Sequence, residues 1–456
     1  MGRLGQTVFR VKAPLVVPRS FREWRRLRAV DSWEPAQLAE HTDRRALGMA
    51  RFAFAQSPFY RQFYSDRGFT LSDFDDPEVL SALPLMTKDL LRENADAIAT
   101  PEATSHNVAR AVTSGSTGEP LALLRDRRVP ARAYEWRLMT WWGVSPGSDV
   151  ATIDRYYRTA AEARRQRALW WPARRFQMDT FNIDQQAVDR FVSQWRRVRP
   201  EYLTGYVGGV VALARILSDR GIDLPSPDAI GVTAGPLMPA QRAEIERFFR
   251  APVYDHYRTS EANWLGGECE AQEGLHLFQD IKRIELLRDG TAAAAGEDGE
   301  IVVTDLTNRV FPLIRYATGD VSARIGEPCS CGRPHPRIRP VRGRVIDFLS
   351  LPSGKMIVGG LTGTFAGMDD YVRQFQIHQA ADFSIDVRVV LTDHPDARAL
   401  AQERVERLRR NVGDEAPVTM REVGGIDASK GKFRYVLSDA PRVPGTTPIS
   451  AAADPR

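Results

Sequence analysis

Short apolar runs alternate with helical patterns through the middle of the chain, and this alternation constrains the fold more than any other feature of the sequence. The run Ala229–Thr233 ends in Ala234-Gly235-Pro236, and a helical pattern follows over Pro239–Phe249. Residues 186–219 carry two further helical patterns. Strands that alternate with helices pair mainly in parallel. The pattern therefore predicts an α/β fold with a mainly parallel core.

The segments on either side of this core also have readable patterns. Residues 20–64 have apolar positions at helical spacing, and their aromatic residues are expected to pack in the core. Thr87 is expected to be the N-cap of a short helix. Strands are predicted at Val108–Val112, Leu121–Leu124, Glu300–Asp305 and Val310–Tyr316, and a turn between strands at Thr291–Ala295.

The last quarter of the chain has its own set of elements. Strands are predicted at Asp386–Leu391, Val418–Val423 and Phe433–Leu437, and one polar helix at Asp396–Arg410. Such a set fits an α+β domain of about a hundred residues. We therefore expect a large domain over 1–344 and a small C-terminal domain over 345–456.

Composition narrows the class of protein. The 456 residues are 43% hydrophobic and 27% charged, as in an ordinary globular protein. No apolar run reaches the roughly 18 residues that span a bilayer, and the net charge of +5 is spread along the chain. We therefore expect a small-molecule substrate, no nucleic acid and no membrane partner; the oligomeric state stays open. Three cysteines in so long a chain do not organise the fold through disulfides, so a cytoplasmic location is expected.

Four motifs carry polar chemistry. The first is a loop of hydroxyl residues and glycines that can present backbone N–H groups to phosphate; it comprises Thr113, Ser114, Gly115, Ser116, Thr117 and Gly118. It is not a Walker A loop, because Glu119 and Pro120 follow instead of Lys and Ser/Thr, and by itself it is also compatible with a simple hairpin turn. The other three motifs are Thr318-Gly319-Asp320, Asp255-His256-Tyr257-Arg258-Thr259-Ser260-Glu261, and Lys430-Gly431-Lys432-Phe433.

In this order and spacing, the motifs resemble those of the adenylate-forming superfamily of acyl-CoA synthetases, adenylation domains and luciferases, in particular its phenylacetate-CoA ligase branch. The resemblance runs from about Pro58 to Ser438. It also includes Leu83-Pro84-Leu85-Met86-Thr87-Lys88, Thr233-Ala234-Gly235-Pro236-Leu237, Thr304-Asp305-Leu306-Thr307-Asn308, Arg315-Tyr316-Ala317-Thr318-Gly319-Asp320 and Gly343-Arg344.

The resemblance implies a role for each matching position. Thr113 to Gly118 would wrap the phosphates of ATP. The adenine would lie between Gly235-Pro236 and the ring of Tyr257, with Asp255 near its amino group. Thr259 would touch the α-phosphate and Glu261 would bind Mg²⁺.

The remaining implied roles concern the ribose and the second domain. Asp320 would hold the ribose hydroxyls, with Arg344 nearby, and Asp347 would lie at the hinge. Lys432 would reach the α-phosphate when the small domain closes as a lid. Such a cation suits a reaction in which an oxyanion attacks the α-phosphorus and pyrophosphate leaves, because two anions must approach each other.

The leading hypothesis is an ATP-dependent ligase that activates an aryl carboxylate as acyl-AMP and passes it to CoA. The sequence departs from the family at Arg258, where Gly is usual, and at Leu121, where many relatives have Lys. Because of these departures, the alternative hypothesis is an adenylate-forming enzyme of natural-product biosynthesis with another acceptor. Examples are a diazotase that uses nitrite and an aryl amine, and an amide or N–N ligase. A nucleotide-binding regulator or a nucleic-acid-binding protein is the hypothesis from another class.

The cysteines suggest a metal site. Cys269, His276, Cys329 and Cys331 make a complete set of tetrahedral zinc ligands, and a closed site of this kind is structural. His335 is an alternative to His276, and three reduced thiols without metal are the alternative to the site as a whole.

The resemblance implies an acyl pocket near residues 202–213, where Gly205, Gly208 and Gly209 would leave space for a substrate. A plain glycine-rich entry into a helix is the alternative. An aromatic wall from Trp141, Trp142, Trp170 and Trp171 is the weaker alternative to core packing for these side chains. Arg155 and Arg158 are candidates for contact with an anion, and Gly359-Gly360 is a candidate for contact with CoA.

Overall fold

The structure is a computed structural model of the whole chain. It describes residues 2–113, 121–154, 160–179, 185–341, 348–353, 356–358, 361, 364–365, 368, 370–426, 435–441 and 448–450. Among these residues, no helix is long and apolar enough to cross a membrane.

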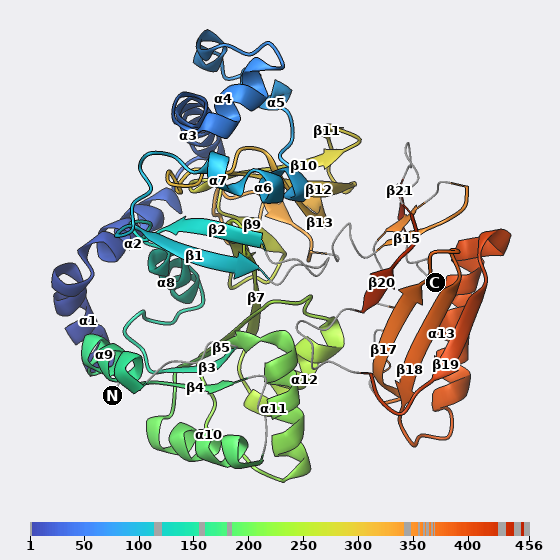
Figure 1. The fold of residues 1–456 in the computed structure, drawn as a ribbon. Coiled ribbons are helices and arrows are strands. Elements are labelled where there is room, and N and C mark those ends of the chain that lie inside the picture. Colours follow the sequence, from blue (N-terminus) through green and yellow to red (C-terminus); the bar gives the residue numbers. More distant parts are fainter. Residues whose placement is uncertain are drawn as a thin grey trace.

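Helices form the N-terminal part of the chain (Figure 1). They are α1 (Gly2–Val16), α2 (Pro18–Val30), α3 (Pro35–Gln56), α4 (Pro58–Ser65), the 3₁₀ turn η1 (Leu71–Asp75), α5 (Val79–Ala82), α6 (Lys88–Glu93) and α7 (Ala95–Ile98). The predicted helical region 20–64 is thus confirmed. Thr87 is the N-cap of α6, because its side chain accepts a hydrogen bond from the Leu90 N–H at 3.2 Å.

A hairpin and a sheet of twelve strands follow. The hairpin pairs β1 (Val108–Thr113) with β2 (Leu121–Asp126). The sheet has the order β11-β10-β12-β13-β14-β9-β8-β7-β6-β5-β3-β4. Its strands are β3 (Val150–Asp154), β4 (Arg175–Asp179), β5 (Tyr202–Tyr206), β6 (Ala229–Thr233), β7 (Val253–Thr259), β8 (Asn263–Glu268), β9 (Leu275–Leu277), β10 (Lys282–Arg288), β11 (Thr291–Ala292), β12 (Asp298–Asp305), β13 (Tyr316–Ile325) and β14 (Arg337–Ile338).

Five strands of this sheet, β3 to β7, run parallel, which confirms the predicted α/β core for this part. The helices associated with the large sheet are α8 (Arg132–Trp141), α9 (Ala160–Trp170), α10 (Gln185–Val198), α11 (Val207–Asp219) and α12 (Pro239–Phe249). Figure 1 shows α10, α11 and α12 beside the parallel strands. Their apolar faces bury a common core around Trp195, Leu203, Val210 and Ile230. The sequence analysis overlooked β5, which separates the two helical patterns of residues 186–219, because a five-residue strand is too short to show a period.

Gly205 holds β5 against β3. A Cβ on Gly205 would lie 2.5 Å from the carbonyl oxygen of Ile153, whereas a Cβ on Gly208 would meet nothing within 4 Å. The expectation that Gly205 leaves space for a substrate is therefore wrong. The lack of a side chain at this position is what allows β5 to pair closely with β3.

We expect Gly205→Ala to destabilise the protein by about 1–3 kcal/mol, since the added methyl group overpacks the sheet. Gly208→Ala, at the start of α11, is the matched control and should be neutral or slightly stabilising. Urea unfolding of the two variants measures the difference, and equal stabilities would contradict the packing role of Gly205.

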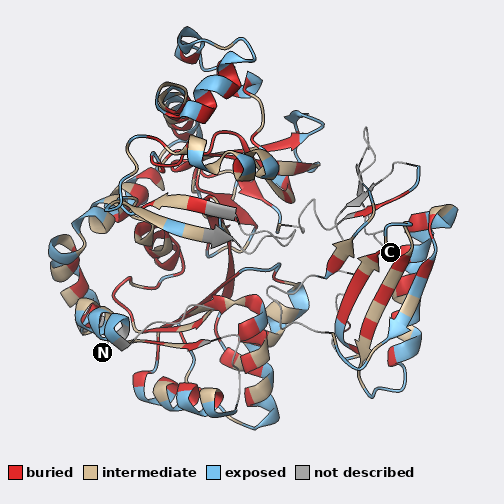
Figure 2. Cartoon of the chain, viewed as in Figure 1, coloured by how far each residue is buried: buried red, intermediate tan, exposed pale blue. Residues whose placement is uncertain are grey.

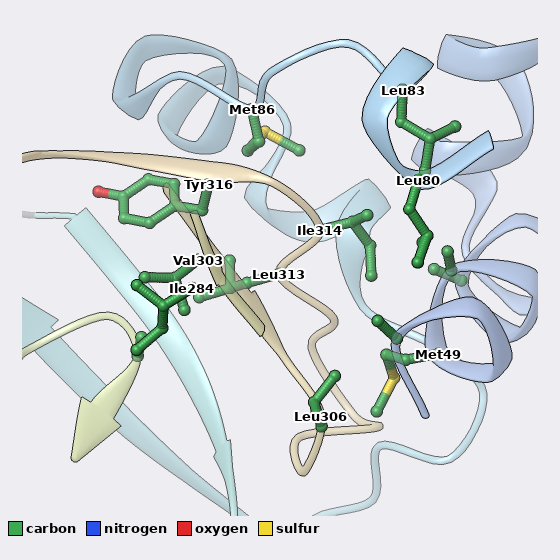
Figure 3. Close-up of a cluster of buried hydrophobic side chains, with 14 of the residues drawn as sticks. Met49, Leu80, Leu83, Met86, Ile284, Val303, Leu306, Leu313, Ile314 and Tyr316 are labelled. Carbon is green, nitrogen blue, oxygen red and sulfur yellow. The ribbon is translucent and has the colours of Figure 1, made fainter. Parts of the chain in front are cut away.

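The other seven strands are antiparallel and pack on the N-terminal helices. Figure 3 shows Met49, Leu80 and Ile314 in the apolar layer between them. The predicted strand Val310–Tyr316 is wrong: β13 begins at Tyr316, and the Met86 N–H bonds instead to the carbonyl of Arg315. Thr291–Ala292, the first two residues of the predicted turn, instead form the short strand β11.

The C-terminal residues form a separate core with two small sheets of orders β15-β16-β21 and β19-β18-β17-β20. Their elements are β15 (Phe348–Ser350), β16 (Met356–Val358), β17 (Val372–Gln379), β18 (Ile385–Leu391), α13 (Ala397–Val412), η3 (Gly413–Glu415), β19 (Val418–Glu422), β20 (Val436–Ser438) and β21 (Pro448–Ser450). Figure 2 shows α13 with a buried face toward β17 and β18 and an exposed outer face. The predicted small α+β unit is thus present, although the sequence analysis overlooked β17.

Candidate functional site

The candidate site lies where the parallel strands end. The carboxyl ends of β3, β5, β6 and β7 share one edge of the sheet, and ligands of open α/β sheets bind at such edges. Ala234, Gly235 and Pro236 form an exposed turn directly after β6, and Ala234 has a φ of 69°. The predicted adenine-binding turn is therefore at the edge where a ligand would bind.

Two predicted nucleotide-binding residues from different motifs meet here. The Tyr257 hydroxyl donates a hydrogen bond to Asp320 Oδ2 at 2.6 Å. Both residues are buried, one on β7 and the other on β13. The two motifs thus belong to one site, although 63 positions separate them in the sequence.

A bulge in β13 places Asp320. Between the pairs Val302–Ala317 and Glu300–Val321 the register shifts, and Gly319 takes a φ of 76°. The Thr318 hydroxyl bonds to the carbonyl of Ile301 at 2.8 Å and anchors this bulge. Asp320 therefore lies inside a strand, although the strand predicted from the sequence ends at Tyr316.

Asp255 shares a buried acidic pair with Glu268. The Asp255 N–H bonds to Glu268 Oε2 at 2.7 Å, and Arg242 bonds to both oxygens of Glu268 at 2.7 and 2.8 Å. Burial and the neighbouring Glu268 raise the pKa of Asp255 to about 8. Burial also raises the pKa of Glu268, but the ion pair with Arg242 opposes this rise. Asp255 is therefore the member of the pair that carries a proton at neutral pH. A protonated carboxyl both donates and accepts hydrogen bonds, as the edge of an adenine requires.

The pKa of Asp255 implies a dependence of stability on pH. The folded state binds a proton at Asp255 that the unfolded chain releases above a pKa near 3.8. Stability should therefore fall as the pH rises from about 4 to about 8. We expect Asp255→Asn to flatten this slope, measured by urea unfolding at pH 5 and pH 8. An equal pH dependence in the variant and the wild type would show that Asp255 ionises normally.

The turn between β7 and β8 carries Thr259 and Glu261. The Thr259 hydroxyl accepts a hydrogen bond from the Ala262 N–H at 2.9 Å, and Glu261 is half-buried. Arg125 on β2 donates to the carbonyl of Ser260 at 2.7 Å, so the β1–β2 hairpin is attached to this turn. Thr113 ends β1 opposite Leu121. Oxygen donors such as the Glu261 carboxylate suit Mg²⁺.

Several predicted residues lie outside the described part of the chain. They are Ser114, Gly115, Ser116, Thr117, Gly118, Arg155, Arg158, Arg344, Asp347, Gly359, Gly360 and Lys432.

The cysteines and one histidine form a cluster on the large sheet. The ligand atoms of Cys269, His276, Cys329 and Cys331 all lie within 4.8 Å of one another. Cys269 Sγ is 3.6 Å from Cys329 Sγ, and Cys331 Sγ is 3.4 Å from His276 Nε2. Around a zinc ion with bonds of about 2.3 Å to sulfur, tetrahedral ligands stand roughly 3.8 Å apart. The donor set and its spacing therefore fit zinc.

The structure also distinguishes the two candidate histidines. His276 Nδ1–H donates to the carbonyl of His335 at 3.0 Å, which directs Nε2 toward the cysteines. Burial lowers the pKa of His276 to about 4, so the ring is neutral, as a metal ligand must be. The His335 ring instead contacts Arg137 Nη2 at 2.5 Å and lies near Asp31. The side chain that faces the three cysteines is therefore that of His276, not that of His335.

The predicted aromatic wall is largely core. Trp141, Trp142 and Trp170 are buried, whereas Trp171 is exposed. The sequence analysis treated Arg258 only as a departure from a motif. In the structure it stands one residue before Thr259, at the sheet edge, where its guanidinium packs on Trp264 with Cζ 4.3 Å from the ring. In the sequence, only its position near the end of a strand could have indicated that Arg258 lies at the site.

The fold, with a large domain and a small C-terminal one, belongs to the class seen in solved structures of acyl-CoA ligases. Comparisons with known proteins agree with this class. The chain is 25% identical to phenylacetate-coenzyme A ligase of Thermus thermophilus over 428 residues, which cover 85% of this chain and 94% of that protein. It is 23% identical to the protein CapK of Staphylococcus aureus, over 79% of this chain and 80% of that protein.

Among solved structures, 2-hydroxyisobutyryl-CoA ligase in the postadenylation state, in complex with an acyl-AMP, superposes with a TM-score of 0.72. The match covers 90% of this chain and 91% of that one, at 20% identity. The same enzyme in its thioesterification state gives a TM-score of 0.60. No family model matches the chain. The resemblance to the phenylacetate-CoA ligase branch is confirmed.

Proposed function

We propose that the chain is an ATP-dependent, AMP-forming ligase that activates a carboxylate as acyl-AMP, releases pyrophosphate and transfers the acyl group to CoA. The contact of 2.6 Å between the Tyr257 hydroxyl and Asp320 carries this proposal, because it unites the predicted adenine and ribose residues in one site. The similarity to proteins named phenylacetate-coenzyme A ligase supports the reaction and the CoA acceptor.

Each residue of the site would bind a particular part of ATP or its metal ion. Gly235-Pro236 and Tyr257 hold the adenine, Asp320 the ribose, and Thr259 the α-phosphate. Glu261 binds Mg²⁺, which supplies positive charge near the phosphates when it is bound. Asp255 meets the polar edge of the adenine, and its proton lets it act as donor and acceptor there.

We also propose that residues 1–344 and 345–456 are separate domains and that the small one acts as a lid. Closure of the lid would bring Lys432 to the α-phosphate, and rotation would then admit CoA. The separate C-terminal core supports this division, and the boundary falls in residues 342–347, outside the described residues. The different states of 2-hydroxyisobutyryl-CoA ligase support such a movement.

The cluster of Cys269, His276, Cys329 and Cys331 would hold a structural zinc ion. All four ligand positions would be filled by protein atoms, so no position remains for a substrate. The ion would connect β9 and the residue after β8 to the turn at Cys329–Gly332, which makes it part of the scaffold behind the site.

The proposal is tested by measuring pyrophosphate release with ATP, Mg²⁺ and a panel of aryl carboxylates, first without and then with CoA. We expect Asp320→Ala to weaken ATP binding about tenfold or more, since a carboxylate loses its bonds to the ribose hydroxyls. Asp298→Ala, on the neighbouring strand β12, is the control. Wild-type ATP affinity in the Asp320 variant would contradict the assigned role, and no pyrophosphate release with any carboxylate would contradict the function.

A further inference from the structure

Arg258 lies at the sheet edge in surroundings that the proposed nucleotide contacts do not use. Tyr257 faces Asp320, whereas Arg258 packs on Trp264, as does His256, whose ring centroid is 5.0 Å from that of Trp264. The Arg258 side chain is exposed. It is therefore adjacent to the proposed phosphate contact of Thr259 but directed to the other side of β7, where the rest of a substrate would lie.

The residues around Arg258 come from several elements. Glu135 on α8, Asp154 at the end of β3, and Tyr202 and Tyr206 on β5 all act on it electrostatically, and Arg125 on β2 lies near it as well. The ends of β3 and β5 are adjacent because Ile153 pairs with Gly205. Asp154 and Tyr206, which end β3 and β5, and Arg258 near the end of β7 thus lie along the same carboxyl edge of the parallel strands, next to the site.

The Arg258 guanidinium is oriented by a neighbouring aromatic ring, and its hydrogen-bond donors remain available for a ligand. Within the described ranges, the Arg258 side chain forms no hydrogen bond and no ion pair, and its guanidinium lies over the ring of Trp264 with Cζ 4.3 Å from the ring centroid. Stacking fixes the plane of the guanidinium and leaves its N–H donors free at the edge. A planar fork of this kind matches a carboxylate or another oxyanion with two parallel hydrogen bonds.

Resting on the proposed function, we propose that Arg258 is the anion-recognising residue of the acyl pocket and that the substrate presents an oxyanion to it, in addition to the phosphates of ATP. The oxyanion is a second carboxylate on the aryl acid, separate from the carboxylate that is activated. An apolar aryl acid such as phenylacetate leaves the guanidinium without a partner and is a poor substrate.

The experiment measures pyrophosphate release by the full-length protein with three kinds of probe. They are phenylacetate, the 2-, 3- and 4-carboxyphenylacetates, and nitrite with an aryl amine. We expect one oxyanion-bearing probe to exceed phenylacetate in kcat/KM by about 10-fold to 100-fold, which is the value of a hydrogen-bonded charge pair. The carboxyphenylacetates are the oxyanion-bearing probes, and release with nitrite and an aryl amine but with no carboxylate would overturn the proposed function.

Variants then assign the preference to Arg258. Arg258→Met should abolish the preference by raising the KM of the oxyanion-bearing substrate, and it should leave the KM of ATP unchanged. Arg258→Lys should retain part of the preference. Arg190→Met, on the exposed face of α10, is the matched control and should behave as wild type. Thermal melts show whether Arg258→Met is folded, and the Lys variant keeps the test valid if it is not.

The results that would contradict the role of Arg258 differ from those that would contradict the proposed function. Pyrophosphate release that is as fast with phenylacetate as with the oxyanion-bearing probes, or a preference that survives in Arg258→Met, overturns the role of Arg258 alone. Pyrophosphate release from phenylacetate but from no oxyanion-bearing probe does the same. Neither ATP binding nor pyrophosphate release with any probe overturns the proposed function as well.

Discussion

Replacing Lys432 by alanine is expected to slow pyrophosphate release by about 10²–10³-fold, the usual cost of losing one preorganised electrostatic contact in an active site. The substrate oxyanion must approach an α-phosphate that is itself negative. A lysine carried by the lid would neutralise charge as the phosphorus becomes pentacoordinate. Its loss should therefore lower kcat more than it raises the KM of ATP.

The chain supplies its own control for this experiment. Lys430 is two residues away and is one of only six lysines, so Lys430→Ala removes the same charge from the same segment. It should retain adenylation within a few-fold. Thioester formation from supplied acyl-AMP and CoA should also survive in Lys432→Ala, because that step no longer involves pyrophosphate. Unchanged pyrophosphate release in Lys432→Ala would refute its assigned role.

Loss of the zinc cluster is expected to have the largest effect on stability. Structural zinc contributes directly to folding, and removing such a metal belongs to the few changes that cost more than about 4 kcal/mol. Cys269 and His276 are fully buried, so without the ion their polar atoms lose their partner in the interior. We expect one zinc per chain by elemental analysis and a marked fall in Tm for Cys331→Ser.

The control for the zinc experiment is Ser330→Ala, which changes the same turn and keeps all three thiols. Its side chain bonds only to the exposed Glu273 at 2.8 Å, so its Tm should stay near that of the wild type. Protein that contains no stoichiometric zinc, or a Cys331→Ser variant as stable as Ser330→Ala, would show that the cluster is three reduced thiols and a histidine.

Much of the fold was predictable because the pattern that specifies it is local. The strand Ala229–Thr233 and the helix Pro239–Phe249 have the correct boundaries, since apolar run, turn and amphipathic pattern follow one another. The errors in the predicted strands have local causes as well. β5 is too short to show a period, and Val310–Tyr316 has strand-like composition, but its backbone bonds to other segments, such as Met86.

The candidate site was predictable as a list of residues and not as an arrangement. The sequence contains the ligands of a zinc site but allows either His276 or His335. The structure selects His276, because the carbonyl of His335 fixes the tautomer while the His335 ring contacts Arg137. Which donor faces a metal depends on contacts between segments that are far apart in the chain, and such contacts have no local pattern.

The sequence by itself determined the class of chemistry, because the motifs of hydroxyl, carboxylate and lysine residues in this order match one kind of phosphate reaction. Only the tertiary structure decided that Tyr257 touches Asp320, that Asp255 is protonated, and that Arg258 stands unpaired at the sheet edge. The physical reason is that burial, register and electrostatic potential arise when distant segments pack together. Residue type and spacing fix what a side chain is able to do, and its surroundings fix its charge and its partner.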